Sequence, residues 1–329
     1  MKRTTPAPLT GVLLLNMGGP DTLNAVRPFL FRLFSDKDLI PLPVGTITQP
    51  VFAWAVSGLR ARKVRRHYEE IGGGSPIGKI TEAQRAALED ALRETGGNFK
   101  VYVGMRYWYP MSKHAALEMK EDGVSQAIVL PLYPQYCAAT TGSSFKDLRR
   151  WLSWAGCSFR LTEIRSYPEH PKYIAALVET VAKAIHGTGP EGMRILFSAH
   201  GVPERLIRSG DPYRAETEAT VAAVMRSFPG IPHSLSWQSR AGREPWLAPD
   251  TVDEVTRLAS EGVRRLVVVP VSFVSDHIET LHELDIRLAA HANKMGILSF
   301  HRAPALNDSP SFIEALKTLV VEQLGDSPF

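Results

Sequence analysis

The sequence predicts an α/β protein made of two doubly wound lobes. Short apolar segments typical of buried strands alternate with helix-length segments, and this alternation indicates parallel sheets covered by helices. The chain contains 329 residues, which favours two domains because a single domain usually has roughly 100–200. The third observation is an internal duplication, which predicts that the two lobes share one architecture and enclose a cleft between them.

The duplicated unit starts at a proline, continues as a helix-length segment that ends near a glycine, and closes with a buried strand. One copy starts at Pro110 and closes with the strand Ala127–Pro131, and the other starts at Pro249 and closes with Leu266–Pro270. The spacing from the first proline to the last is the same in both copies. This equal spacing favours a repeated strand–helix–strand fold.

The duplication extends to the first strand of each lobe, because segment 13–20 resembles segment 195–203. This alignment matches Asn16 with Ser198. Near the C-terminus, apolar residues recur on one face over residues 312–324 and predict an amphipathic helix.

The same alignment matches Thr140 of the first copy with Glu279 of the second. The first copy therefore offers hydroxyls where the second offers acids. The loop Thr140–Ser144 has backbone N–H groups and hydroxyls that suit an anion, although a helix cap explains the same residues equally well.

Composition and charge are those of a soluble globular protein, with 44% hydrophobic and 22% charged residues. The net charge of +4 fits acidic ligands or an anionic lipid surface but is too small to indicate nucleic acid, and no nucleic-acid-binding motif is present. The two cysteines favour a reducing compartment, although one bridge between them stays open. No segment resembles a signal peptide or is long enough to span a membrane.

An acidic segment follows the buried strand that ends at Pro270. It carries Asp276, His277, Glu279 and Glu283, and the carboxyl edge of a parallel sheet is where ligands bind. On a helix, Glu279 and Glu283 point the same way, so their charges repel unless a cation or a proton lies between them. The competing interpretation makes Asp276 an N-cap, with Glu279 completing a capping box.

A histidine is predicted at the same edge of the second lobe. The segment Phe197–Pro203 predicts a strand followed by a sharp turn, which leaves His200 at the carboxyl edge. An imidazole in that position titrates near neutral pH and can take a proton or bind a metal. A single histidine is often structural, but its place at the same edge as Glu279 favours a functional role.

Two further segments are candidates for ligand contact. The loop Gly72–Pro76 follows a basic stretch that includes Lys63, and these cations suit carboxylates or simply a solvated helix face. The run Leu39–Val44, with Phe52 and Trp54 nearby, is unusually apolar for a loop-rich segment. It could line an apolar ligand site or touch a membrane, and packing in the core is the alternative.

Taken in order along the chain, these segments resemble the ferrochelatase family. The resemblance runs from about Gly11 to Leu306, and it is very specific because the motifs are collinear. The motifs that carry it are Leu15–Pro20, Gly72–Pro76, Gly104–Tyr107, Tyr133–Tyr136, Thr140–Ser144, Ser198–Gly201, Gly210–Tyr213, Trp237–Ser239, Pro245–Trp246 and Ser275–Thr280.

The resemblance implies a lyase that inserts Fe²⁺ into protoporphyrin IX to give protohaem with release of two protons, the last step of protohaem biosynthesis. It also implies two similar Rossmann-like lobes of the chelatase type, each a parallel four-stranded sheet flanked by helices. The predicted division is an N-terminal lobe over residues 1–160 with a porphyrin lip, a C-terminal lobe over 161–305 with the catalytic histidine and the acidic helix, and a C-terminal helix over 306–329 that packs back on the lobes.

The resemblance also implies roles for individual residues. His200 and Glu279 would face each other across the porphyrin as catalytic residues and metal ligands. Glu283 would continue an acidic line on a helix with a widened, π-type turn, with Asp276 and His277 beside it. The porphyrin would be bound by Met17, Arg60, Lys63, Tyr68, Ser75, Arg106, Tyr107 and Trp246.

Departures from the family bear on cofactors and location. Family members often continue the acidic line at the position that Arg287 occupies here, which argues against a long carboxylate-only metal channel. Some members hold a [2Fe–2S] cluster through C-terminal cysteines, whereas no cysteine follows Cys157 in this sequence, so we expect no iron–sulfur cluster and no prosthetic group. The lack of a transit peptide suits a bacterial enzyme, which we expect to be cytoplasmic, with peripheral contact at the inner face of the membrane as an open alternative.

The chemistry of metal insertion explains these residue types. A neutral imidazole at His200 would accept a pyrrole proton or bind Fe²⁺. Glu279, near other carboxylates, would have a raised pKa that suits proton exchange. A tetrapyrrole carrier and a cobalt chelatase are competing functions, and coproporphyrin is a competing substrate, although the apolar lip favours protoporphyrin. The oligomeric state, the side of iron entry, and the choice between base and metal ligand for His200 stay open.

Overall fold

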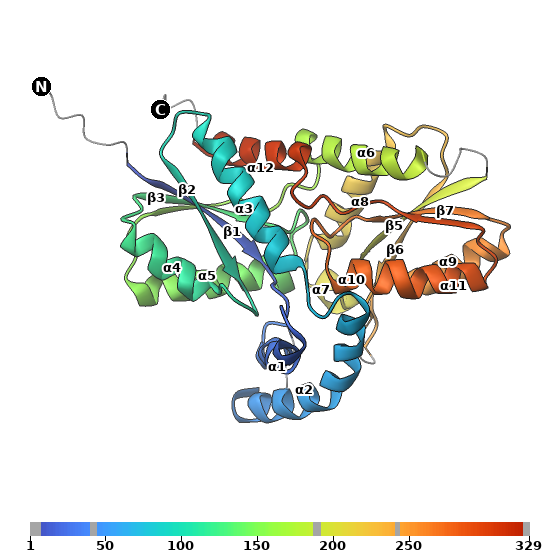
Figure 1. The fold of residues 1–329 in the computed structure, drawn as a ribbon, viewed down its shortest axis with the longest axis horizontal. Helices are drawn as coiled ribbons and strands as arrows, with labels where there is room; N and C mark the ends of the chain where they lie inside the picture. Colours follow the sequence, from blue (N-terminus) through green and yellow to red (C-terminus); the bar gives the residue numbers. More distant parts are fainter. Residues whose placement is uncertain (1–7, 40–44, 187–191, 241–243, 325–329) are drawn as a thin grey trace, which may run out of the picture.

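The computed structural model describes residues 8–39, 45–186, 192–240 and 244–324. It contains two four-stranded sheets, each parallel throughout, with strand orders β2-β1-β3-β4 and β6-β5-β7-β8. Figure 1 shows the two sheets next to each other, each flanked by helices. The predicted fold class, two α/β lobes of one architecture, is confirmed.

The two sheets repeat one order of strands, whereas the helices that connect and cover the strands differ. The first consists of β1 (Thr10–Asn16), β2 (Phe99–Met105), β3 (Gln126–Pro131) and β4 (Arg160–Glu163), with α3 (Ile77–Arg93), α4 (Ser112–Glu121), the π-helix η2 (Ala138–Gly142) and α5 (Ser143–Ala155). The second consists of β5 (Met193–His200), β6 (His233–Gln238), β7 (Arg265–Pro270) and β8 (Ser299–Arg302), with α6 (Pro171–His186), α7 (Glu204–Arg208), α8 (Tyr213–Met225), α9 (Thr251–Ser260), α10 (Ile278–Leu281), the π-helix η3 (Glu283–Leu288) and α11 (Ala289–Lys294).

The central strands are buried on both faces. Val12–Leu15 of β1 and Leu266–Val268 of β7 have no exposed surface. Strands that are covered by helices on both sides need apolar side chains at every position, which explains why these runs are continuously apolar. One hydrophobic cluster contains Leu14 of the first lobe, Phe197 of the second and Phe312 near the C-terminus. The two lobes therefore pack as one body.

The strand registers correct one detail of the predicted alignment. In the first sheet Leu15 pairs with Pro131, and in the second Ser198 pairs with Pro270. Because the two prolines are equivalent in the duplication, Leu15 corresponds to Ser198, and the match of Asn16 with Ser198 was wrong. Apolar residues at the start of a strand look alike at any offset, so the strand's own sequence could not determine the register.

The corrected register makes Met17 the counterpart of His200. Each of these residues lies two positions after the matched pair of strand residues. The shift also aligns Gly18 with Gly201, so a glycine follows the central strand at the same place in both lobes. The carboxyl edges of the two sheets therefore present a thioether in one lobe and an imidazole in the other.

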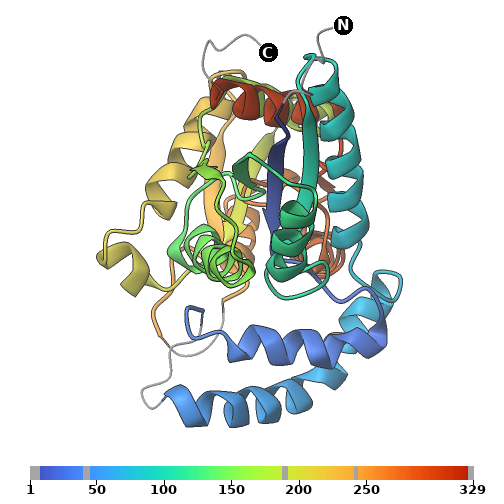
Figure 2. The same cartoon turned by 90° about the vertical axis from the view of Figure 1, so that its left-hand side faces the viewer.

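Helices α1 (Val26–Ser35) and α2 (Gly45–Glu70) form a pair below the sheets in Figures 1 and 2. Their apolar cluster also contacts Met17 from the first lobe and Ile278 from the second, so the pair touches both lobes. The predicted apolar lip, Leu39–Val44, lies outside the described residues from residue 40 onward.

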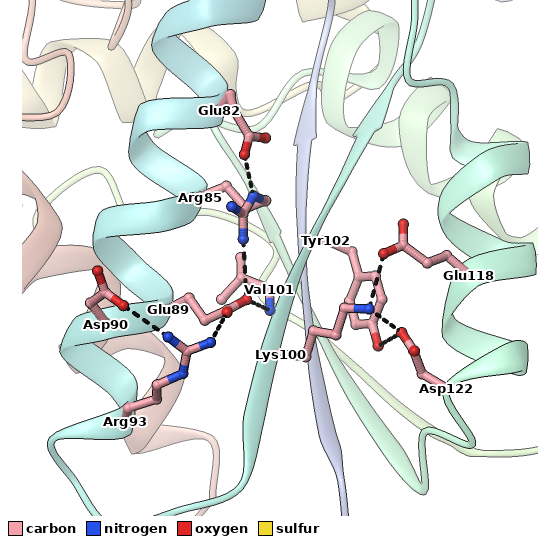
Figure 3. A network of polar contacts seen from close by, with 10 residues as sticks. All are labelled: Glu82, Arg85, Glu89, Asp90, Arg93, Lys100, Val101, Tyr102, Glu118 and Asp122. Carbon is pink, nitrogen blue, oxygen red and sulfur yellow. Dashed lines mark hydrogen bonds and ion pairs between the residues drawn. The ribbon is translucent and has the colours of Figure 1, made fainter.

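A polar network holds α3 against β2 on the outside of the first lobe (Figure 3). Glu89 of α3 accepts a hydrogen bond from the backbone N–H of Val101 at 2.9 Å, and Arg85 and Arg93 bind the same carboxylate. Exposed ion pairs contribute little stability. The bond from the strand backbone to the Glu89 carboxylate nevertheless ties the helix directly to the strand beside it.

The helix predicted near the C-terminus is α12 (Pro310–Glu322), which packs against α3 and α6. Its residues Phe312, Leu316 and Val320 are fully buried, as the predicted apolar face requires. Among the described helices, none is long and apolar enough to cross a bilayer. The domain boundaries at residues 160 and 305 stay a prediction.

Candidate functional site

His200 and Glu279 meet at the carboxyl edge of the second sheet. His200 is the last residue of β5, and Glu279 lies in α10, the short helix that follows β7. The imidazole Nδ1 lies 2.7 Å from Oε2 of Glu279. The expectation that these residues face each other across a porphyrin was wrong, because no ring fits between atoms in direct contact. They are neighbours since β5 and β7 are adjacent strands.

The backbone around His200 is held on both sides. Its N–H donates to Ser272 Oγ at 2.8 Å, and its carbonyl accepts from the Tyr213 hydroxyl at 2.9 Å. The next residue, Gly201, has no room for a side chain, because a Cβ there would lie 2.9 Å from the carbonyl oxygen of Gln238. A histidine fixed in this way presents its ring in a defined direction.

The exposure of the pair suits contact with a ligand. The side chain of His200 is 37% exposed, whereas that of Glu279 is 15% exposed. Because Nδ1 is taken by the carboxylate, Nε2 is the nitrogen directed away from Glu279. A carboxylate that orients an imidazole in this manner is a common support for metal binding and for proton transfer.

Ser239 and Gln238 connect Glu279 to the second carboxylate of the site. The Ser239 hydroxyl lies 2.6 Å from Oε2 of Glu283 and 3.3 Å from Oε2 of Glu279. The Gln238 amide donates to Glu283 at 3.3 Å and to the Glu279 backbone carbonyl at 3.0 Å. Burial, and then repulsion from Glu279, raise the pKa of Glu283. Sequence reasoning did not single out these two residues, although they belong to a motif of the resemblance, residues 237–239.

Glu283 begins the π-helix η3, and this is the widened turn that the resemblance implied. The N–H of Arg287 bonds to the carbonyl of His282 at 2.9 Å, one residue farther along the chain than in an α-helix. The side chain of Arg287 is exposed. The turn that follows Glu283 therefore ends in a cation.

The charges of the central pair reverse two expectations. Burial lowers the pKa of His200, but attraction and a hydrogen bond from Glu279 outweigh burial and raise it above the usual 6.5. Burial raises the pKa of Glu279, but the charge and hydrogen bond of His200 outweigh it and lower that pKa. Both shifts favour the charged forms, an imidazolium at His200 and a carboxylate at Glu279. We expected a neutral imidazole and a raised pKa at Glu279, because the sequence does not reveal that the imidazole is the nearer charge.

Asp276 and His277 lie beside the pair, but their contacts serve the fold. Asp276 forms an ion pair with Arg302 at 3.0 Å and accepts hydrogen bonds from Asn307 and Thr280, both at 2.9 Å. Burial lowers the pKa of His277, so its ring is neutral near pH 7. The arrangement separates Asp276 from the row of free carboxylates that was predicted for this helix.

Four of the residues predicted to bind a porphyrin belong to the supporting structure. Tyr68, Ser75 and Tyr107 are buried, and the Tyr107 hydroxyl donates to Asp36 at 2.6 Å. Arg106 binds the same carboxylate at 2.7 Å. These side chains brace the first lobe, and their predicted contact with a porphyrin stays a prediction.

The other four predicted porphyrin residues are partly or fully exposed. Arg60 and Lys63 are exposed on α2, and the Arg60 guanidinium lies over the Phe34 ring at 5.7 Å. Met17 is half-buried and packs against the apolar cluster of α1 and α2. Trp246 packs on the turn after His200. A Cβ placed on Gly201 would lie 3.3 Å from the Trp246 ring.

Comparisons with known proteins identify close relatives in sequence. The family model described as Ferrochelatase matches residues 9–324. A ferrochelatase of Gloeobacter violaceus is 48% identical, over 96% of this chain and 98% of the relative. A ferrochelatase of Geobacter metallireducens is 46% identical, over 94% of this chain and 97% of the relative.

Solved structures with a similar fold include two chelatases. SirB from Bacillus subtilis, solved with Fe³⁺, is 10% identical with a TM-score of 0.58, over 97% of this chain and 96% of that one. CbiX, described as the terminal enzyme of sirohaem biosynthesis in denitrifying bacteria, is 14% identical with a TM-score of 0.51, over 97% and 99%. At this identity the likeness concerns the fold alone.

Proposed function

The chain belongs to the ferrochelatase family, and on this basis we propose that it inserts Fe²⁺ into protoporphyrin IX to give protohaem, as the last step of protohaem biosynthesis. The observation that carries the proposal is the pair of His200 and Glu279, 2.7 Å apart, with a partly exposed imidazole. Insertion must remove two protons from pyrrole nitrogens and hold a divalent ion beside the ring. An imidazole and a carboxylate suit both tasks.

Proton transfer begins from the charged pair. A divalent cation approaching the porphyrin repels the imidazolium of His200, so its pKa falls and its proton moves to a carboxylate. Glu283 suits the role of final acceptor because its pKa is raised. The Ser239 hydroxyl, within 3.3 Å of both carboxylates, can pass the proton from Glu279 to Glu283. Loss of the Nδ1 proton leaves the remaining proton on Nε2, so His200 must change tautomer, with Nδ1–H again donated to Glu279. Nε2 can then take a pyrrole proton or bind Fe²⁺.

The reaction requires no prosthetic group, since iron is a substrate and the proton carriers are side chains. Two cysteines cannot supply the four thiolates of a cysteine-bound iron–sulfur cluster. Burial raises the pKa of Cys137 to about 12 and also raises that of Cys157. Thiols of this kind stay protonated near neutral pH, which disfavours metal ligation.

Protoporphyrin is the proposed substrate because α2 offers apolar surface as well as cations. Val51, Trp54 and Leu59 are exposed large hydrophobic residues of this helix, and Arg60 and Lys63 follow them. Protoporphyrin has two propionates and an apolar vinyl edge, whereas coproporphyrin has four carboxylates. A mixed apolar and basic surface suits the first better.

A porphyrin fluorescence assay tests the function. The purified protein is mixed with protoporphyrin or coproporphyrin and with Fe²⁺ under argon, Zn²⁺ or Co²⁺. We expect turnover with Fe²⁺ and Zn²⁺ and a higher kcat/KM for protoporphyrin. Binding of the porphyrin without turnover of any metal would identify a carrier, and turnover with Co²⁺ alone would identify a cobalt chelatase.

We also propose that the protein is cytoplasmic and meets the inner face of the membrane peripherally through α2. Trp54 is 64% exposed and Leu59 is 84% exposed, and a basic run begins at Arg60. Exposed aromatic and aliphatic side chains next to Lys and Arg favour shallow insertion into an anionic lipid surface.

Vesicle flotation tests the membrane contact. We expect binding to vesicles that contain phosphatidylglycerol, weaker binding at high salt, and little binding to neutral vesicles. Trp54→Ala should weaken flotation, whereas Trp154→Ala is the matched control, because Trp154 is 59% exposed on α5. Equal recovery in the soluble fraction under all conditions would rule out the contact.

A further inference from the structure

Helix α3 buries two polar side chains on one face. Thr81 and Gln84 are three residues apart, which puts them on the same side of the helix, and both are fully buried. Buried polar groups in folded proteins nearly always have hydrogen-bond partners, so the partners of these two residues indicate what this face holds. A separate face of α3 is tied to β2 by Glu89 (Figure 3).

Thr81 is connected to the segment that carries Met17. The amide of Asn16 donates to Thr81 Oγ1 at 3.0 Å, and the N–H of Met17 donates to Asn16 Oδ1 at 2.8 Å. Thr81 in turn donates to the carbonyl of Ile77 within its own helix at 2.8 Å. Thr81, near the N-terminal end of α3, thus fixes the position of Met17, the counterpart of His200.

Gln84 reaches across to the second lobe. Its amide donates to Ser275 Oγ at 3.1 Å and to the carbonyl of Asn307 at 2.8 Å. Both partners are far away in the sequence, and Ser275 lies in the loop that leads into α10. One side chain of the first lobe therefore holds two segments of the second.

Asn307 passes this contact on to the helix of Glu279. Its Oδ1 accepts from the N–H of Asp276 and its Nδ2 donates to the carboxylate of Asp276, both at 2.9 Å. Asp276 then accepts from the Thr280 hydroxyl at 2.9 Å, one residue after Glu279. Asn307 adopts a left-handed backbone with φ of 45°, a conformation that asparagine tolerates better than most residues.

We propose that Gln84 is a positioning residue for metal insertion: together with Thr81 it sets the spacing between Met17 and the helix of Glu279. The inference rests on the proposed function, and it takes the bound porphyrin to lie between Met17 and this helix. Within this chain from Met17 to Thr280, Thr81 and Gln84 are joined by one turn of α3, and the other links are hydrogen bonds between buried or half-buried groups. Such links resist stretching more than apolar contacts do. Small displacements of reacting groups lower a rate by up to about 10²-fold.

The test compares two buried glutamines that both join the lobes. Gln84→Met keeps the side-chain volume and removes the amide that reaches Ser275 and Asn307. Gln135→Met is the matched control, since the amide of Gln135 is also buried but donates to Thr220, Tyr173 and Val271. We measure kcat with Zn²⁺, the Kd for protoporphyrin, the Tm, and the out-of-plane resonance Raman bands of the bound porphyrin.

We expect kcat of Gln84→Met to fall at least about tenfold while the Kd stays within about threefold, and kcat of Gln135→Met to stay within about twofold. The out-of-plane bands should weaken only in Gln84→Met. Equal values of kcat in the two variants would overturn the proposal. A fall in kcat that is proportional to the fall in Tm in both variants would also overturn it.

A second variant keeps the test decisive if Gln84→Met does not fold. Asn307→Gly removes the clamp on Asp276, keeps the carbonyl that accepts from Gln84, and tolerates the positive φ. It should show the same loss of kcat at an unchanged Kd, and an unchanged kcat would refute the positioning role. A wild-type protein that inserts no metal would refute the proposed function instead, and the Raman comparison would still test the spacing.

Discussion

The ends of β3 and β7 occupy equivalent positions in the two lobes, yet the side chains that follow them differ in their chemistry. A π-helix follows each strand: η2 is the first helix after β3, and η3 comes after β7 and α10. Around η2 the polar side chains are hydroxyls, and those of Thr141, Ser143 and Ser144 are buried. Around η3 they are the carboxylates of Glu279 and Glu283, which lie beside an imidazole.

This difference teaches that the repeated backbone supplies a position and that a few side chains supply the reaction. Met17 and His200 occupy equivalent places after the central strands. A thioether cannot accept a proton near neutral pH, whereas an imidazole can. In the proposed reaction, only the second lobe therefore offers a proton acceptor at this position.

The two lobes also use their buried charges differently. In the first lobe Arg106 lies 2.7 Å from Asp36 and 3.6 Å from Asp147, and both carboxylates are buried. Arg150 lies 2.8 Å from Asp147, so two cations offset the two carboxylates and hold this part of the first lobe together. In the second lobe the pair of His200 and Glu279 keeps one partly exposed member. We infer that the first lobe provides rigidity and the second provides reactive groups.

The largest effect should come from the two equivalent positions. His200→Ala should lower the insertion rate by about 10²–10⁴-fold, because a required proton acceptor is lost, while porphyrin binding is largely kept. Met17→Ala should lower the rate by less than about tenfold, because a thioether accepts no proton. The measurements are kcat from porphyrin fluorescence and Kd by titration. The proposed difference between the lobes would be wrong if His200→Ala kept more than about a tenth of the activity, or if kcat fell equally in both variants.

The next largest effect concerns the acids. Glu279→Gln should lower kcat by about 10²-fold, because it removes the direct partner of His200. Glu283→Gln should lower kcat less, because the Glu283 carboxylate is connected to that of Glu279 indirectly, through the Ser239 hydroxyl. Thr140→Ala, at the matched position in the first lobe, should leave kcat within about twofold. Reversal of the order of the two glutamates would show that Glu283 carries the role assigned here to Glu279.

The third prediction concerns the pKa of His200, measured by NMR titration of its ring protons. Removing the charge of Glu279 in Glu279→Gln leaves burial as the main influence, so the pKa of His200 should fall. Because the pKa of His200 is raised from 6.5 and that of Glu279 is lowered from 4.5, the pair should stabilise the wild type most between pH 4.5 and 6.5.

This stabilisation should decline as the pH rises through the raised pKa of His200, and also as the pH falls through the lowered pKa of Glu279. Urea unfolding of the wild type and of Glu279→Gln across the pH range measures the difference in unfolding free energy. A difference that does not vary with pH would contradict the charged pair.

The fold class, and the placement of His200 and Glu279 at one edge of a sheet, could be predicted from the sequence because both depend on local signals. Continuous apolar runs mark strands covered on both faces, and the equal proline spacing marks the repeat. His200 and Glu279 follow two such strands directly. Their closeness then follows from the pairing of β5 with β7.

Contacts between distant segments could not be predicted in the same way. The sequence does not indicate that Asp36 lies 2.7 Å from Arg106, because the two residues are far apart in the chain. The predicted contact of Arg106 with the porphyrin stays a prediction. Ser239 reaches both carboxylates from a backbone with φ of 67°, a conformation that no pattern around it predicts. The direction of the pKa shift at Glu279 depends on which charged group is nearest to it in space. The sequence does not give that distance.

The smallest effect should come from Arg287, whose turn follows the acids of the second lobe and has an exposed side chain. Arg287→Glu would extend the row of Glu279 and Glu283, and an exposed charge reversal leaves the core untouched, so the Tm should change little. A carboxylate there attracts divalent ions, and the KM for Zn²⁺ and Fe²⁺ should fall by about two- to fivefold, more at low salt than at high salt. Arg226→Glu, the same change at the exposed end of α8, is the control. An unchanged KM for both metals, or an equal change in the control, would show that ions do not approach the carboxylates along this helix.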